Sequence, residues 1–241
     1  LSAILGFGTM VYNGQNAVDN QFPWQVLVRS NFTGGPKYCG GVILSETWIL
    51  TSANCVGGAD NVTISLGSNL WSTPKLYTEA LNVITHPNFK NAKHNDLGLV
   101  ELDDPLKFSD SIQRVHLPTK DQIGITFVGV KSRFSGWGLD PEDKIHPGLS
   151  LKYVDMKVIK NSECASDYGS IVTDSVVCTT GGRICGSDFG GPLTVEEKEG
   201  WVLIGIASFN LGCESEKPIG FSRVTSYLNW ISNVTGIEIT L

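Results

Sequence analysis

The sequence predicts an all-β protein, and three observations support this prediction. The 241 residues include 27 Gly and 10 Pro, so turns are frequent and long helices are not expected. Short runs rich in β-branched and aromatic residues lie between turn formers, for example at 42–44, 48–50 and 62–66. One short segment, residues 224–234, is apolar at 224, 227, 228, 231 and 234, which is the spacing of a helix.

Composition and charge exclude two classes of protein. The 18 Lys and Arg residues against 24 Asp and Glu residues give a formal net charge of −6. A nucleic-acid binder needs a basic face for phosphate contacts, so we expect no nucleic-acid partner. No apolar run reaches the roughly 18–20 residues that cross a bilayer, so we expect no membrane span.

The six cysteines indicate disulfide bonds. None forms a Cys-x-x-Cys pair, and the four histidines show no ligand spacing, so we expect neither a metal site nor a cofactor. Disulfides form in oxidising compartments, which predicts a secreted, extracellular protein. The cysteines fall in three neighbouring pairs, Cys39 with Cys55, Cys164 with Cys178 and Cys185 with Cys213.

Three Asn-x-Thr sequons begin at Asn31, Asn61 and Asn233. Such sequons permit N-glycosylation in a secretory compartment. The chain is therefore predicted to be a glycoprotein if it follows that route.

Several motifs together resemble the chymotrypsin/trypsin-like serine proteases. Asp188-Phe189-Gly190-Gly191-Pro192 resembles the nucleophile loop Asp-Ser-Gly-Gly-Pro, and the segments 23–26, 39–55, 94–100 and 135–138 resemble further family motifs. The resemblance covers residues 11–235. It implies two antiparallel Greek-key six-stranded β-barrels, three disulfides and a C-terminal helix.

This resemblance also implies the domain boundaries. Residues 1–10 form an N-terminal extension or the remnant of a pro-segment, and residues 11–235 form the protease-like domain. Within it we expect a first barrel at 11–113, a second barrel at 114–223 and the helix at 224–235, followed by a tail at 236–241. Met10 precedes Val11, so a cut after a basic residue is not available there.

Two catalytic positions of the family are expected to have changed. The resemblance places Phe189 at the serine and Asn54 at the histidine, and it retains Asp96 as the third member of the triad. A phenyl ring has no atom that can attack a carbonyl, and an amide does not accept a proton near neutral pH. We therefore predict that the chain is not an enzyme and that Asp96 accepts a hydrogen bond from the Asn54 side chain.

The oxyanion loop is also expected to differ. It comprises Ser187, Asp188 and Phe189, with Ser187 where the family has glycine. The family pairs the aspartate of this loop with a new N-terminal ammonium. Without a cut before Val11, we expect Lys37 to take the place of that ammonium beside Asp188.

The primary specificity pocket is expected to be occluded. Its base is predicted to carry Arg183 where trypsin-like enzymes have Asp. The wall positions Asn210 and Ile219 carry side chains that are expected to project into the cavity. The residues concerned are Arg183, Ile184, Ser208, Phe209, Asn210 and Ile219.

These expectations favour a binding function. We predict a proteolytically inactive homologue that binds an extracellular protein. Among inactive family members, the chain is most similar to the inactivated protease paralogues of mites, which implies a decoy or inhibitor of host defence such as complement. The alternative is a weakly active hydrolase that uses Ser187 and His94 and prefers acidic residues through Arg183. A third reading is a structural or storage protein without a specific partner.

Overall fold

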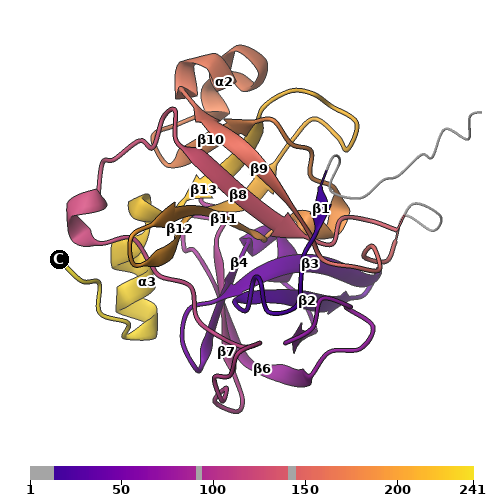
Figure 1. Cartoon of the computed structure of the whole chain (residues 1–241). Helices are drawn as coiled ribbons and strands as arrows, with labels where there is room; N and C mark the ends of the chain where they lie inside the picture. The colour runs from indigo at the N-terminus through magenta and orange to yellow at the C-terminus, as the bar shows by residue number, and fades with distance from the viewer. Residues whose placement is uncertain (1–13, 91–93, 141–144) are drawn as a thin grey trace, which may run out of the picture.

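The computed structural model describes residues 14–90, 94–140 and 145–241. Two β-barrels lie one above the other in Figure 1, and the C-terminal helix packs beside them. The expected extension at 1–10 and the residue Val11 fall outside the described residues.

The first barrel is closed, in the order β2-β3-β4-β7-β6-β5. All of its pairings are antiparallel. Its interior buries Val26, Val28, Ile49 and Ile64, and the pleat directs the intervening Leu27 and Leu50 into the cluster between the barrels. Its strands are β2 Gln25–Phe32, β3 Gly35–Ile43, β4 Trp48–Thr51, β5 Asn61–Leu66, β6 Leu76–Thr85 and β7 Gly98–Leu102.

The second barrel closes through the pairing of β8 with β9. The ring runs β8-β9-β10-β13-β12-β11, and the short strand β1 (Gln15–Asn16) adds to the outer edge of β9. This arrangement confirms the predicted fold class. The strands of the ring are β8 Lys131–Gly136, β9 Lys152–Ile159, β10 Val176–Thr180, β11 Pro192–Glu197, β12 Gly200–Phe209 and β13 Ile219–Arg223.

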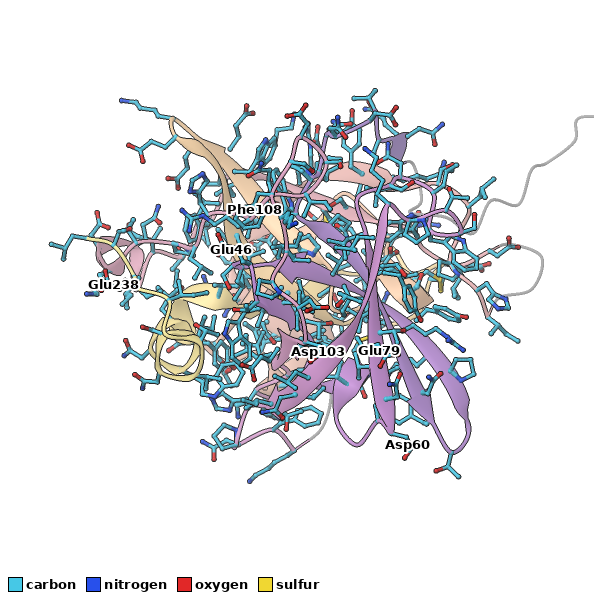
Figure 2. All side chains as sticks on the ribbon, turned by 90° about the horizontal axis from the view of Figure 1, so that it is seen from below. Glu46, Asp60, Glu79, Asp103, Phe108 and Glu238 are labelled. Carbon is cyan, nitrogen blue, oxygen red and sulfur yellow. A yellow bond between two sulfur atoms is a disulfide. The ribbon has the colours of Figure 1, made fainter. Side chains whose placement is uncertain are left out.

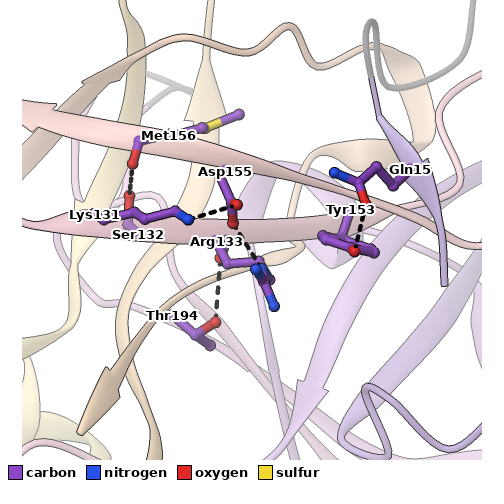
Figure 3. A network of polar contacts seen from close by, with 8 residues as sticks. All are labelled: Gln15, Lys131, Ser132, Arg133, Tyr153, Asp155, Met156 and Thr194. Carbon is purple, nitrogen blue, oxygen red and sulfur yellow. Dashed lines mark hydrogen bonds and ion pairs between the residues drawn. The ribbon is translucent and has the colours of Figure 1, made fainter. Parts of the chain in front are cut away.

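Polar contacts reinforce this closure on the outer face (Figure 3). Asp155 on β9 accepts from Arg133 on β8 at 2.8 Å and from Lys131 at 2.9 Å. The Arg133 guanidinium also lies 4.6 Å from the ring centre of Tyr153, whose hydroxyl donates to Gln15 of β1. These contacts join three strands outside the hydrophobic core.

The helices are short, as the glycine and proline content predicted. The C-terminal helix α3 (Leu228–Thr235) buries Leu228 and Ile231 and ends at Gly236, which adopts the left-handed conformation of a C-cap with φ 73°. The other helices are α1 Ala53–Val56 and α2 Asn161–Tyr168, with single 3₁₀ turns η1 Lys120–Gln122, η2 Gly169–Ile171, η3 Gly186–Asp188 and η4 Val224–Ser226.

A hydrophobic cluster joins the two barrels and α3. Trp24 and Leu50 of the first barrel share this cluster with Trp137 and Ile206 of the second and with Leu228 of the helix. Packing in this cluster therefore fixes the positions of the loops that follow the strands between the two barrels. The three predicted disulfides are all present, namely Cys39–Cys55, Cys164–Cys178 and Cys185–Cys213.

Acidic side chains lie on the surface of the first barrel. Figure 2 labels several acidic side chains, among them Asp60, Glu79 and Asp103 of the first barrel, and Asp60 and Asp103 are exposed. Within the described residues, no helix is long and apolar enough to cross a membrane, and no group of three or more His, Cys, Asp or Glu side chains is arranged to hold a metal ion.

Candidate functional site

Asp96 is a buried carboxylate just before β7, with 1% of its surface exposed. Its Oδ1 accepts the backbone N–H of Asn54 at 2.8 Å, and its Oδ2 accepts the hydroxyl of Ser208 at 2.7 Å. The expected bond from the Asn54 side chain is not the observed one. Asn54 lies in the first turn of α1, so its N–H faces Asp96, and the residue is exposed to solvent.

Lys37 on β3 is the cation next to this carboxylate. Its Nζ donates to the backbone carbonyl of Asn54 at 2.8 Å, and its charge acts on Asp96. The prediction that Lys37 pairs with Asp188 is therefore wrong. A strand fixes the direction of its side chains, and β3 directs this one toward α1.

Burial is the largest influence on the pKa values of Asp96 and Lys37. It raises the pKa of Asp96 to about 6, while the Asn54 N–H, the Ser208 hydroxyl and the Lys37 ammonium act to lower it. Burial also lowers the pKa of Lys37, against the opposing effect of Asp96. The two groups thus titrate closer together than free Asp and Lys do.

Phe189 lies between the barrels rather than free in a cleft. Its half-buried ring packs against the hydrophobic cores of both barrels. Its carbonyl accepts the N–H of Gly40 at 2.8 Å, which ties the loop to β3. The next residue, Gly190, has φ 82°, and a Cβ there would collide with Thr51 and the Gly40 carbonyl, so glycine is required.

Ser187 faces the interior of the protein. The residue is 1% exposed, and its hydroxyl donates to the carbonyl of Gly138. His94, its partner in the alternative mechanism, is exposed before β7. No observation in the described residues therefore brings these two side chains together as nucleophile and base.

Asp188 is a second buried carboxylate, with 0% of its surface exposed. Its Oδ1 accepts the N–H of Gly138 at 2.8 Å, and its Oδ2 accepts the N–H of Cys185 at 2.9 Å. Burial raises the pKa of Asp188 to about 7, although both N–H groups act to lower it.

The residues of the predicted pocket are packed or paired. Arg183 forms an ion pair with Glu216 at 2.7 Å, and Asn210 Nδ2 donates to the Ile184 carbonyl at 2.7 Å. Phe209 packs against Tyr168 with ring centres 4.9 Å apart, and Ile219 is 2% exposed. These contacts are compatible with a narrowed pocket, and the occlusion stays a prediction.

The sequon asparagines lie on the outer parts of the fold. Asn31 of β2 is directly opposite Asn61 of β5, and Asn233 is exposed on α3. Glycosylation at these positions remains a prediction.

Two contacts of the site were not expected from the sequence. Lys37 was assigned to another carboxylate, and Ser208 was placed only in a pocket wall. Both are 17 or more residues from their partners, since Lys37 is 17 residues from Asn54 and Ser208 is 112 from Asp96. Such long-range pairs leave no local pattern in the sequence, and the family resemblance suggested a different partner, Asp188, for Lys37.

Comparisons with known proteins agree with the fold. A family model described as "Trypsin" matches residues 11–231. Collagenase from Hypoderma lineatum is 34% identical over 235 residues, which is 94% of this chain and 88% of the relative. Brachyurin from Leptuca pugilator is 34% identical over 236 residues, 94% of this chain and 99% of the relative. The solved structure of HL collagenase aligns with a TM-score of 0.86 and 34% identity, over 94% of this chain and 99% of that chain.

The prediction that the chain is not an enzyme is wrong by these comparisons. The relatives are named as a collagenase, a brachyurin and, in Mus musculus, a tryptase 33% identical over 92% of this chain and 87% of its own length. The prediction was based on two side chains, Asn54 and Phe189, whereas the similarity to these named proteases extends along nearly the whole chain.

Proposed function

Because this chain belongs to the trypsin family, we propose that Asn54, Asp96 and Phe189 hold its triad positions and that the chain binds a protein at the exposed Asn54. The observation that supports this proposal is the chemistry of the site. The exposed side chain is a carboxamide, which donates and accepts hydrogen bonds, and the Asp96 beneath it already has its donors.

The partner class in this proposal is an extracellular protein. The three disulfides support secretion, because such bonds persist in oxidising compartments. Surface loops on a rigid barrel are suited to recognition, and Asn54 belongs to such a connection between β4 and β5. A host-defence protein such as a complement component, for which the chain would act as a decoy or inhibitor, is the first partner to assay.

Peptide hydrolysis is the second candidate function. The names of the relatives favour it, because the chain resembles a collagenase, a brachyurin and a tryptase over most of its length. If the chain is a hydrolase, a side chain other than Asn54 or Phe189 must act as the nucleophile.

A matched pair of variants tests the binding proposal. Asn54→Arg changes the exposed site residue, and Asn16→Arg makes the same change at an exposed position on β1 of the other barrel, outside the sequons. We expect a plasma protein that is captured by the wild type and by Asn16→Arg to be lost with Asn54→Arg. Equal capture by all three proteins contradicts the proposal.

A second assay separates the two candidate functions. Purified protein is incubated with a peptide library and with a fluorophosphonate, and Ser187→Ala is the control variant. Cleavage or labelling that disappears in Ser187→Ala supports the hydrolase, whereas site-dependent binding with the library left intact supports the binding function.

A further inference from the structure

The peptide of Asn54 lies between a cation and an anion. Its carbonyl accepts from Lys37 Nζ at 2.8 Å, and its N–H donates to Asp96 Oδ1 at 2.8 Å. One residue therefore joins a side chain from β3 to a side chain before β7. Lys37 is half-buried, and the bond from its Nζ to the Asn54 carbonyl holds the ammonium at this point.

The hydrogen-bond donors to Asp96 are neutral. They include the Asn54 N–H and the Ser208 hydroxyl, and the nearby Tyr227 phenol from the start of α3 is neutral at ordinary pH as well. Among the described groups that act on Asp96, the positive charge comes from Lys37. Burying a carboxylate without a nearby cation is costly, so the charge of Lys37 stabilises the ionised form of Asp96.

We propose that Lys37 is the positioning residue of this site, where it neutralises Asp96, holds the Asn54 peptide and so excludes a second cation from position 54. This inference goes beyond the proposed function, since it needs neither a partner nor an activity. It also limits the chemistry that a partner presents beside Asn54 to neutral or acidic groups, because a basic group there would meet the ammonium.

The inference accounts for the residue type at position 54. A neutral carboxamide is compatible with an ammonium bound to its own carbonyl. A protonated imidazole at the same position would share the space near Asp96 with Lys37, and like charges within about 4–6 Å of each other disfavour the charged form.

The pKa of a histidine introduced at position 54 reports how strongly Lys37 disfavours a second positive charge there. The variant Asn54→His is titrated by NMR of the imidazole in three backgrounds, which carry Lys37, Lys37→Met or, as a control, Lys157→Met. Lys157 is an exposed lysine on β9 of the other barrel. We expect the pKa of the histidine to be lower by about one unit with Lys37 in place than in the Lys37→Met background, and unchanged by Lys157→Met.

Equal histidine pKa values with Lys37 in place and in the Lys37→Met background would overturn the inference. Lys37→Gln is the second variant if Lys37→Met does not fold, because its amide still donates a hydrogen bond without carrying a charge. Lys37→Arg restores the charge and is expected to restore the low pKa. A merely structural role of Lys37 would make Gln and Arg equivalent in this titration. Loss of partner binding in other experiments has no effect on this readout.

Discussion

Two buried carboxylates of this molecule have different surroundings. Asp96 accepts the Asn54 N–H and the Ser208 hydroxyl and lies near the ammonium of Lys37, whereas Asp188 accepts the backbone N–H groups of Gly138 and Cys185. The pKa of Asp96 is raised to about 6 and that of Asp188 to about 7. Burial raises both pKa values. The Asn54 N–H, the Ser208 hydroxyl and the Lys37 charge oppose this effect at Asp96, whereas backbone N–H groups oppose it at Asp188.

Both carboxylates make stability depend on pH in the same direction. A carboxyl whose folded pKa lies above its unfolded value near 3.8 binds its proton more tightly in the folded state. Stability is therefore greatest at low pH for these groups and falls as the pH rises toward the folded pKa. The fall ends near pH 6 for Asp96 and near pH 7 for Asp188.

The largest predicted effect concerns Asp188. Between pH 5 and 8, titration of Asp188 is expected to lower the free energy of unfolding of the wild type by about 3 kcal/mol, since one pKa unit corresponds to about 1.4 kcal/mol. Asp188→Asn cannot titrate, so we expect this decrease to be absent in the variant. Urea unfolding at several pH values measures this loss. Asp155→Asn is the control, because the bond from Arg133 lowers the pKa of Asp155 and moves its titration below this range. An unchanged pH slope in Asp188→Asn contradicts the comparison.

The next effect concerns the cation beside Asp96. We expect Lys37→Met to lower the free energy of unfolding by about 1–3 kcal/mol at pH 8, because it leaves a buried carboxylate without its counter-charge. At pH 5 the loss should be smaller, since Asp96 is then largely protonated. Lys157→Met is expected to change stability by less than about 0.5 kcal/mol. A loss that is equal at both pH values would assign Lys37 a packing role instead.

A smaller effect is expected at Ser208. Ser208→Ala removes the hydroxyl that donates to Asp96 Oδ2. We predict a loss of about 1 kcal/mol at neutral pH, the usual contribution of one hydrogen bond, and a further rise in the pKa of Asp96. Ser162→Ala on the exposed side of α2 is the control. Thermal unfolding of both variants near neutral pH checks this, and equal changes in the two variants count against the role of Ser208.

The smallest effect is expected for an ion pair with an exposed partner. The carboxylate of Glu216, which pairs with Arg183, is 85% exposed. Solvent screens such a charge, so we expect Glu216→Gln to change stability by less than about 1 kcal/mol. If Glu216→Gln lowered stability as much as Lys37→Met does, solvent exposure would not explain the difference between the two charge interactions.

The family resemblance, carried by short sequence motifs, predicted the two barrels and the three disulfides, and the apolar spacing of 224–234 predicted the C-terminal helix. The glycine Gly190, for example, is part of a motif and is also required by its positive φ. The position of Lys37 has no such signature. Its partner depends on the direction in which β3 presents the side chain, and the resemblance suggested Asp188 where the structure has Asn54 and Asp96.

The sequence also could not show that a backbone N–H, and not a side chain, bonds to Asp96. The sequence suggested that the Asn54 side chain meets Asp96, yet the N–H at the start of α1 takes that place. Backbone donors are independent of the residue type, so a residue pattern cannot reveal them. The burial of Ser187 was missed for a similar reason, since its hydroxyl is satisfied by a carbonyl 49 residues away.

Carbon-13 NMR of the aspartate carboxyl groups tests the central claim most directly. In Lys37→Met, we predict that the pKa of Asp96 rises above its wild-type value while the pKa of Asp188 stays the same. A rise at Asp188, or no change at Asp96, would contradict the assignment of Lys37 as the counter-charge of Asp96.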